Sequence, residues 1–183
     1  MTGLNECIPC AAGSYGNISG ALVCTLCGAG KSEAIGAQNS STCLLCSAGS
    51  YSSVTGLIDV SGCIQCPAGK FSEAAGATAE DSACANYGVG KYSPSLGLNT
   101  SAGCILCDIG KYSSFLIATS SSACILCVKG KYNAVLGARS EIGCVLCSSG
   151  KYSEAKRATA ESTCANCSAG SYAIDPGQDS LAE

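Results

Sequence analysis

Residues 104–112 read Cys-Ile-Leu-Cys-Asp-Ile-Gly-Lys-Tyr, and the pattern returns at residues 124–132 as Cys-Ile-Leu-Cys-Val-Lys-Gly-Lys-Tyr. A Cys-x-x-Cys pair opens each unit, a glycine follows three residues after the second cysteine, and an aromatic residue usually stands two residues later. The first cysteines lie 17 to 21 residues apart, and in nine of nine units a glycine stands six residues after that cysteine. A position restricted to glycine indicates a positive φ or a close backbone approach. The sequence therefore predicts a tandem repeat of about 20 residues.

The composition of the chain argues against a hydrophobic core. Its 183 residues include 17 cysteines and 23 glycines but only two phenylalanines and no tryptophan. Such cysteine density is typical of small scaffolds in which disulfides replace the core, and it favours an oxidising compartment. No segment has a helical period, and the apolar residues inside the Cys-x-x-Cys pairs favour very short strands. We predict a small disulfide-rich fold, an elongated tandem-repeat solenoid or rod with short β-strands and loops and little or no helix.

The domain organisation follows the repeat. Residues 1–6 form an N-terminal lead-in, residues 7–172 an array of nine repeats, and residues 173–183 a C-terminal tail or the start of a further unit. Similar stretches recur in alternate units, and this second rhythm indicates that the repeats can be paired as units of about 40 residues. The lead-in lacks the basic start and apolar stretch of a signal peptide, so we expect a secreted chain to be part of a longer precursor.

One stretch carries a family likeness. Residues 63–72 read Cys-Ile-Gln-Cys-Pro-Ala-Gly-Lys-Phe-Ser and are followed by Gly76 and Cys84. This stretch resembles the ephrin-receptor-like cysteine-rich repeat, which is itself similar to the first half of tumour-necrosis-factor-receptor cysteine-rich domains. The likeness extends over residues 7–172 and implies a ladder of disulfides in an extracellular or cell-surface protein. The chain departs from the family where Tyr87 replaces a cysteine.

The resemblance implies that the second cysteine of each unit bonds to the first cysteine of the next. The resulting pairs are Cys10–Cys24, Cys27–Cys43, Cys46–Cys63, Cys66–Cys84, Cys107–Cys124, Cys127–Cys144 and Cys147–Cys164. This scheme leaves Cys7, Cys104 and Cys167 unpaired or intermolecular. Spacing alone also allows bonds from first to first and second to second cysteine, or bonds inside each Cys-x-x-Cys pair.

Other chemistries fit the sequence less well. Paired Cys-x-x-Cys motifs are also a zinc-ribbon signal, but nine consecutive units without a single histidine favour disulfides. The lack of histidine and of paired carboxylates predicts that the chain is not an enzyme and needs no cofactor or metal. A net charge of −3 gives no basic footprint for nucleic acid. No apolar run is long enough to span a membrane.

Two kinds of residue are predicted to lie on the surface. The loop sequons at Asn17, Asn39 and Asn99 are candidate glycosylation sites, whereas the sequon at Asn166 lies inside a Cys-x-x-Cys pair and is weaker. A lysine also recurs once per unit, either as a solvated row or as a track for an anionic partner. These lysines are Lys70, Lys91, Lys111, Lys131 and Lys151.

The apolar residues between paired cysteines, such as Leu44–Leu45 and Ile105–Leu106, point to a function. Adjacent side chains in a strand point to opposite sides, so some of them should form an exposed stripe that associates. We predict an extracellular structural protein that assembles with itself, head to tail, into a glycosylated filament or surface fibre. The alternative is a ligand-binding ectodomain fragment of a cysteine-rich receptor or adhesin, in which the unit around Cys84 and Tyr87 departs most from the repeat.

Overall fold

A computed structural model describes residues 7–33 and 35–181 of the chain, so the predicted lead-in at residues 1–6 lies outside the described residues. The described part contains two-residue strands, one helical turn α1 (Glu80–Ala83) and five 3₁₀ turns. The strands are β1 (Ser14–Tyr15), β2 (Thr25–Leu26), β3 (Lys31–Ser32), β4 (Leu44–Leu45), β5 (Ser50–Tyr51), β6 (Ile64–Gln65), β7 (Lys70–Phe71), β8 (Ala85–Asn86), β9 (Lys91–Tyr92), β10 (Ile105–Leu106), β11 (Lys111–Tyr112), β12 (Ile125–Leu126), β13 (Lys131–Tyr132), β14 (Val145–Leu146), β15 (Lys151–Tyr152) and β16 (Ala165–Asn166). The 3₁₀ turns are η1 (Val60–Gly62), η2 (Ser101–Gly103), η3 (Ser121–Ala123), η4 (Glu141–Gly143) and η5 (Glu161–Thr163).

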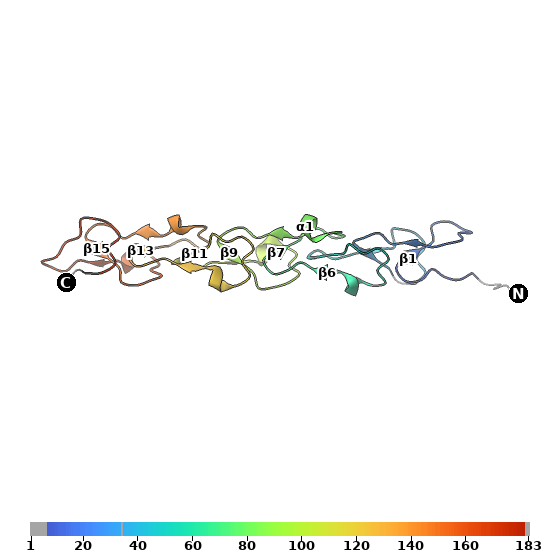
Figure 1. Ribbon diagram of the computed structural model, residues 1–183, viewed down its shortest axis with the longest axis horizontal. Coiled ribbons are helices and arrows are strands. Elements are labelled where there is room, and N and C mark those ends of the chain that lie inside the picture. The colour runs from blue at the N-terminus through green and yellow to red at the C-terminus, as the bar shows by residue number, and fades with distance from the viewer. Residues whose placement is uncertain (1–6, 34, 182–183) are drawn as a thin grey trace. The chain divides into compact units, whose positions relative to one another are not determined.

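Each pair of consecutive strands forms one small antiparallel sheet, β1 with β2, β3 with β4, and so on along the chain. The first strand follows the repeat glycine, and the second lies between the cysteines of the next Cys-x-x-Cys pair. In the β11–β12 sheet, for example, Lys111 pairs with Leu126 and Tyr112 pairs with Ile125. A disulfide joins the cysteine directly before the second strand to the cysteine four residues before the first strand, as Cys124 and Cys107 do at β12 and β11, so the loop that contains the first strand is closed covalently. Figure 1 shows the order of these short strands along the chain.

The chain divides into two compact units. The first comprises Met1–Ala85 and Leu96–Ser101, and the second comprises Asn86–Ser95 and Ala102–Glu183. The division passes through β8, in the repeat where Tyr87 stands in a cysteine position. Each unit contains successive hairpins of the same kind, so the small disulfide-rich fold with almost no helix is confirmed.

Backbone hydrogen bonds between successive repeats hold each unit together. In the second unit the amide of Gly110 donates to the carbonyl of Asn133 at 2.8 Å, and the amide of Cys127 donates back to the carbonyl of Gly110 at 3.0 Å. The amide of Asn133 in turn donates to the carbonyl of Ala158 at 3.0 Å. The first unit repeats the pattern around Gly49, which donates to Ser72 and accepts from Cys66. Because both backbone groups are used, the repeats can stack without an apolar core.

The interior consists mainly of sulfur and small polar groups, together with a few alanines and Tyr87. The second cysteines of the internal pairs are almost completely buried, and so is the residue that follows the aromatic position in six of the repeats. These residues are Ser52, Ser72, Ser93, Ser113, Asn133 and Ser153. Their side chains bond to the backbone two residues ahead, as Ser113 Oγ does when it accepts from the amide of Phe115 at 3.3 Å. The buried polar groups therefore close local turns instead of being left unsatisfied.

Asn133 is the largest of these buried side chains, and its hydrogen bonds are satisfied in two directions. Its Oδ1 accepts from the amide of Val135 at 2.9 Å, within the same loop. Its Nδ2 donates to the carbonyl of Lys111 at 2.8 Å, in the preceding repeat. The longer amide thus joins two repeats where a serine would close only its own turn.

The repeat position is occupied by glycine for both of the reasons that the sequence pattern indicated, namely a positive φ and a close approach of another backbone segment. Gly130 has a φ of +74°, and a Cβ built on it would lie well under 3.0 Å from the carbonyl oxygen of Gly177. The same approach to the loop two repeats ahead occurs at the internal glycines Gly13, Gly30, Gly49, Gly90 and Gly110. Any side chain at such a position would collide with backbone, which has little room to move.

Candidate association surfaces

Seven disulfides join the second cysteine of one repeat to the first cysteine of the next. They connect the same pairs that the resemblance implies, Cys10–Cys24, Cys27–Cys43, Cys46–Cys63, Cys66–Cys84, Cys107–Cys124, Cys127–Cys144 and Cys147–Cys164. Their Cα–Cα distances of 5.5 to 5.9 Å are those of ordinary disulfides. Cys7 carries an exposed free thiol, and Cys167 carries a half-buried one.

Tyr87 and Cys104 occupy the two positions that hold a disulfide in the other repeats. Tyr87 is only 2 % exposed, so its ring fills the space of the missing bond. Burial raises the pKa of the Tyr87 hydroxyl, and the neighbouring Cys104 raises it further. The Tyr87 ring therefore contributes to the packing of this repeat and is not itself exposed to a ligand.

The lysine row is largely neutralised by acidic residues of the following loop. Lys70, Lys131 and Lys151 form ion pairs with the glutamates ten residues ahead, Glu80, Glu141 and Glu161, at 2.7, 2.8 and 3.5 Å. Lys111 pairs with Asp108, which also pairs with Arg157 at 3.3 Å. Among the lysines predicted to form the row, Lys91 alone has no ion pair within residues 7–33 and 35–181. A continuous cationic track is therefore not available to a partner.

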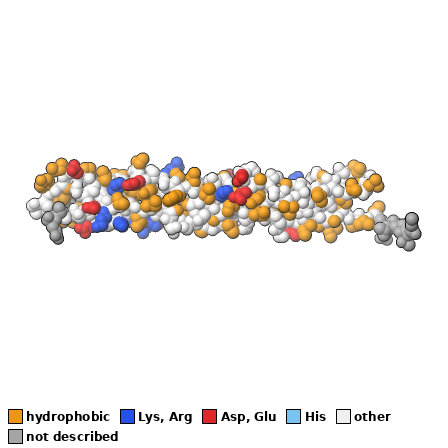
Figure 2. Space-filling view, in the orientation of Figure 1, with side chains coloured by type: hydrophobic (Ala, Val, Ile, Leu, Met, Phe, Trp, Pro, Cys, Tyr) orange, Lys and Arg blue, Asp and Glu red, His pale blue; other side chains and the backbone are white. Residues whose placement is uncertain are grey.

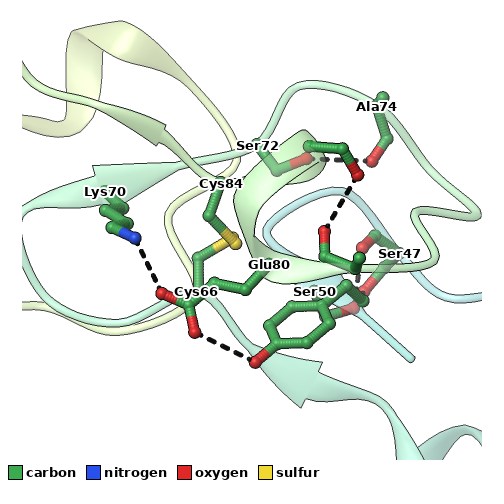
Figure 3. The surroundings of a disulfide bond; sticks show 11 residues. Ser47, Ser50, Cys66, Lys70, Ser72, Ala74, Glu80 and Cys84 are labelled. Carbon is green, nitrogen blue, oxygen red and sulfur yellow. Dashed lines mark hydrogen bonds and ion pairs between the residues drawn. A yellow bond between two sulfur atoms is a disulfide. The ribbon is translucent and has the colours of Figure 1, made fainter. Parts of the chain in front are cut away.

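The ion pair between Lys70 and Glu80, beside the Cys66–Cys84 disulfide, is an example of these contacts (Figure 3). Lys70 Nζ donates to Glu80 Oε1, and the Tyr51 hydroxyl donates to Glu80 Oε2 at 3.3 Å. The hydrogen bond from Lys70 lowers the pKa of Glu80, and the same bond raises the pKa of Lys70. Burial and the neighbouring Glu80 carboxylate raise the pKa of Tyr51. The loop that carries α1 is thereby fastened to the hairpin that precedes it.

The predicted glycosylation sites lie on the surface. Asn17, Asn39 and Asn99 are all exposed and lie in loops outside the strands. Asn39 Oδ1 accepts hydrogen bonds from the Ser41 amide at 2.9 Å and from the Ser41 hydroxyl. Asn166 in β16 is exposed as well, so burial does not separate it from the other three.

Wherever the two residues inside a Cys-x-x-Cys motif form a strand, both of them are exposed. This holds for β2, β4, β6, β8, β10, β12, β14 and β16. Leucines at the second position, such as Leu45 and Leu106, touch a glycine of the next loop, yet they remain more than 40 % exposed. Figure 2 shows hydrophobic side chains distributed over the visible face of both units, with few charges between them. The sequence predicted that one of the two side chains in each motif would be exposed. The structure exposes both, because a two-residue strand is too short for either side chain to be buried.

The last repeat has an open stacking surface. Gly150 in the eighth repeat and Gly170 in the ninth have positive φ values of 77° and 90°, but no atom of residues 7–33 or 35–181 lies within 4 Å of a Cβ built on either. Tyr172 is 82 % exposed, whereas the corresponding Tyr152 is half-buried by its bridge to Gln178. Residues 173–178 nevertheless continue the repeat, because Ala173 and Gln178 accept from the amides of Gly150 and Ser153. This surface has the groups that hold a further repeat in the interior of the array.

The first repeat has the matching open surface. Gly20 in the first repeat and Gly36 in the second have positive φ values, and no atom of the described residues lies within 4 Å of a Cβ built on either. Their counterparts Gly56 and Gly76 touch a leucine of the preceding repeat, whereas the residue at that position before Gly36 is Pro9. The surrounding side chains are apolar and exposed, and Leu22 is 98 % exposed. They line an open pocket of about 580 Å³ together with Cys7. The pocket is large enough to receive side chains of another repeat.

One shallow groove of about 470 Å³ lies in the second unit. Its lining includes Leu106, Val135 and Leu136, with Lys91 and Arg139 beside them. Neither cation has an ion pair among the described residues. The groove therefore combines an apolar floor with an uncompensated positive charge.

Comparison with known families identifies the first part of the array. Residues 1–41 and 34–84 match the family model described as tyrosine-protein kinase ephrin type A/B receptor-like. Residues 1–84 are therefore similar to ephrin-receptor-like repeats. No curated protein matched the chain. The disulfides and stacking bonds after residue 84 follow the same pattern, so the resemblance noted in the sequence is confirmed.

Ephrin-receptor-like repeats and seven disulfides are consistent with an extracellular location. Within residues 7–33 and 35–181 no helix has the length and apolar character needed to cross a bilayer. The same residues contain no group of three or more histidine, cysteine or acidic side chains placed to hold a metal ion. The exposed apolar strands and the open glycine positions near the two ends of the array are therefore the features from which a function is inferred.

Proposed function

We propose that the chain is an extracellular structural protein whose copies stack head to tail into a filament or surface fibre. The observation that carries the proposal is the pair of open glycine positions, Gly150 and Gly170. In internal repeats the same positions press against the loop two repeats ahead. The first repeat of a second copy supplies such a loop at Gly20, and the second repeat supplies one at Gly36.

The backbone groups of the two open surfaces are complementary. The amide of Cys10 in a second copy is placed to donate to the carbonyl of Gly170, as Cys27 donates to Gly13. The amide of Gly20 is placed to donate to the carbonyl of Cys167, as Gly36 donates to Cys10. In the part of the chain that the structure describes, none of these four groups has another backbone partner. Pairing them would satisfy donors and acceptors that are otherwise left to solvent.

A proline in the first Cys-x-x-Cys pair is compatible with this stacking. Pro9 corresponds to Leu26, which lies opposite Ser14 in the β1–β2 sheet. The next pair along, Cys27 with Gly13, is hydrogen-bonded. Hydrogen-bonded and non-bonded pairs alternate along an antiparallel ladder, so the Leu26 position donates no ladder bond. The missing amide hydrogen of Pro9 therefore costs the stacked sheet nothing.

Contacts from one end of a copy to the other end of its neighbour are heterologous, and such contacts grow into open fibres when the rotation does not close a ring. Repeat proteins stay monomeric when their terminal repeats present a polar face. Here the terminal surfaces present Tyr172 on one side and Leu22 on the other. Glycans on Asn17, Asn39 or Asn99 would coat such a fibre, and we include them in the proposal.

Sedimentation and electron microscopy of the 183-residue chain test this proposal. We expect concentration-dependent oligomers and threads. Tyr172→Glu places a charge on the open surface and should weaken association at least tenfold, because burial of the ring contributes about 2 kcal/mol. Ile142→Glu is the matched control, since Ile142 is 90 % exposed in η4 and away from both ends. A monomer at high concentration, or equal effects of the two variants, would contradict head-to-tail stacking.

The second candidate function is binding of a ligand, which the groove at Leu106, Val135 and Leu136 supports. Its chemistry fits an extended peptide with an acidic residue beside apolar ones, because Lys91 and Arg139 supply the positive charge. Titration with such a peptide and with the double variant Lys91→Ala, Arg139→Ala separates the two functions. Binding by a chain that remains monomeric would favour the receptor or adhesin.

A further inference from the structure

We propose that the repeat around Tyr87 is a proteolytic processing site, where one cut after Lys91 by a protease of trypsin-like specificity divides the array into two pieces. This inference goes beyond the proposed stacking and does not depend on it. It starts from the disulfides, each of which closes one loop of the array. In the described part of the chain none of the seven spans residues 85–106, because Cys66–Cys84 ends before this stretch and Cys107–Cys124 begins after it.

The basic residues are distributed so that a trypsin-like cut separates the chain at one place. Lys91 lies in the loop between Tyr87 and Cys104, and a tyrosine cannot form a disulfide. A cut after Lys91 therefore leaves none of the seven disulfides across the break. The other nine of the ten lysines and arginines lie in loops closed by Cys27–Cys43, Cys66–Cys84, Cys107–Cys124, Cys127–Cys144 and Cys147–Cys164. A cut after any of these nine leaves its two sides joined through sulfur.

Lys91 also lacks the ion pair that holds the corresponding lysine of other repeats. Lys70, Lys131 and Lys151 each pair with a glutamate ten residues ahead. Ser101 stands ten residues after Lys91, and Lys91 has no ion pair among residues 7–33 and 35–181. Trypsin-like proteases bind the substrate lysine through a carboxylate in their specificity pocket. The protease therefore has no acidic side chain to displace from the ammonium group of Lys91.

The strand β9, which carries Lys91, is held by hydrogen bonds and packing without a disulfide. Lys91 lies opposite Leu106 of β10, and the neighbouring Gly90 amide donates to the carbonyl of Ser113 at 2.8 Å. A protease needs its substrate extended and free of a neighbouring strand, so β9 must leave β10 before cleavage. In the repeats with a disulfide, the loop stays closed when its strand detaches, and this limits the opening. The loop after Tyr87 has no such restraint, so we expect it to be open for a larger fraction of the time.

The cut is a hydrolysis of the Lys91–Tyr92 peptide bond. One water molecule is consumed, and a carboxylate on Lys91 and an ammonium group on Tyr92 are formed. Residues 96–101 follow the cut but belong to the first compact unit. There the amide of Gly97 donates to the carbonyl of Cys66 at 2.8 Å, and the carbonyl of Leu98 accepts from the amide of Ser72 at 3.0 Å. The cut thus replaces a covalent connection by hydrogen bonds that a denaturant can break.

The test uses the 183-residue chain with its disulfides intact and limiting amounts of trypsin. Denaturing gels without reductant should show two fragments, residues 1–91 and 92–183, identified by mass. Mass spectrometry of reduced samples should find cleavage after Lys91 at least tenfold faster than after Lys111. Lys111 is the internal control, because it is also half-buried and has the same place in β11, inside the Cys107–Cys124 loop.

Tyr87→Cys tests the cause, since it restores a cysteine at the position that pairs with Cys104 in the repeat pattern. With a disulfide from position 87 to Cys104, verified by intact mass, cleavage after Lys91 should slow at least tenfold. The fragments should then stay joined until a reductant is added, and cleavage after Lys111 should not change. Lys91→Gln keeps Tyr87 in place and should abolish the two fragments, while Lys111 is cleaved as before.

Three outcomes would overturn the inference. Cleavage after Lys91 that is no faster than cleavage after Lys111 would show that the loop after Tyr87 is not more open. A single band without reductant, in a sample where reduction reveals cuts at other lysines, would show that Lys91 is protected. Equal slowing at both lysines in the Tyr87→Cys chain would show that cleavage follows unfolding of the whole chain and not of this loop.

Discussion

At the scale of single residues, glycine does two different things in this array. Every repeat glycine has a positive φ, and six of them also face the backbone of a later loop, whereas Gly150 and Gly170 face no described residue. Positive φ alone costs a substituted residue roughly 1–2 kcal/mol. A collision with packed backbone costs more, because neither chain can move far.

Gly130 and Gly150 separate the two effects, since their φ values of 74° and 77° are nearly equal. Gly130→Ala should lower the free energy of unfolding by about 3 kcal/mol or more, from strain and collision together. Gly150→Ala, with no atom within 4 Å, should lose only the strain of roughly 1–2 kcal/mol. Urea titrations of both variants measure this, and equal losses would show that Gly130 has no close neighbour.

Tyr87 is the second residue with a specific role, because it fills the position of an absent disulfide. Tyr87→Ala should destabilise the chain by about 3–5 kcal/mol, the usual cost of deleting a large buried aromatic ring. Tyr172→Ala is the control, since Tyr172 is 82 % exposed and should change stability by less than about 0.5 kcal/mol in the monomer. Thermal unfolding at low concentration would show whether the two tyrosines differ in this way.

At the scale of elements, one strand of each hairpin could be predicted, and the other strand and the loop contacts could not. Apolar residues inside the Cys-x-x-Cys pairs indicated short strands, and the structure confirms them as the even-numbered strands β2 to β16. The odd-numbered strands after the repeat glycine, such as β11, were not expected, because Gly-Lys-Tyr-Ser is typical of a turn and loop. The four residues of α1 were not expected, because Glu80–Ala83 is one turn without a helical period. The ion pairs between the lysine row and the next loop were also missed. A spacing of ten residues, as between Lys131 and Glu141, was the available signal.

The Lys70–Glu80 pair makes the stability of the α1 loop depend on pH. The pKa of Glu80 is lowered below its ordinary value of 4.5, so its contribution is complete above pH 4.5 and is lost as the pH falls through the lowered pKa. The pKa of Lys70 is raised, so its contribution is lost only as the pH rises through a value above 10.5. Wild type should therefore be more stable than Glu80→Gln at pH 7 and lose that advantage in acid.

Urea unfolding at several pH values measures the difference between wild type and Glu80→Gln. Glu154→Gln is the matched control, because Glu154 is exposed and has no ion pair in the described part of the chain. A difference for Glu80→Gln that stays constant from pH 7 into strong acid would show that the ion pair contributes nothing.

At the scale of the whole molecule, disulfides carry the stability that a hydrophobic core supplies elsewhere. Each of the seven closes a loop with a sequence separation of 14 to 18 residues. Each such loop is worth roughly 3 kcal/mol, so all seven together contribute on the order of 20 kcal/mol. That sum exceeds the net stability of an ordinary domain.

Reduction should therefore unfold the chain at room temperature. We expect a phosphine reductant to abolish the protection of amide hydrogens from exchange, while a metal chelator without reductant leaves protection unchanged. Retention of protected amides after complete reduction would mean that the backbone network between repeats is sufficient by itself. Loss of protection on chelation would instead favour bound metal.

The sequence alone determined the repeat, the glycine positions and the short strand inside each Cys-x-x-Cys pair, because these features recur with the spacing of the cysteines, about every 20 residues. The tertiary structure decided that the Lys-Tyr position, such as Lys111–Tyr112, forms the partner strand and not a loop. Tertiary structure decided which loop meets which glycine two repeats away, the burial of Tyr87 and the neutralisation of the lysine row. It also decided that both residues between the cysteines are exposed. These features depend on how successive repeats stack. Stacking is fixed by backbone hydrogen bonds, and because nearly every residue type can form them, the sequence does not show which residues do.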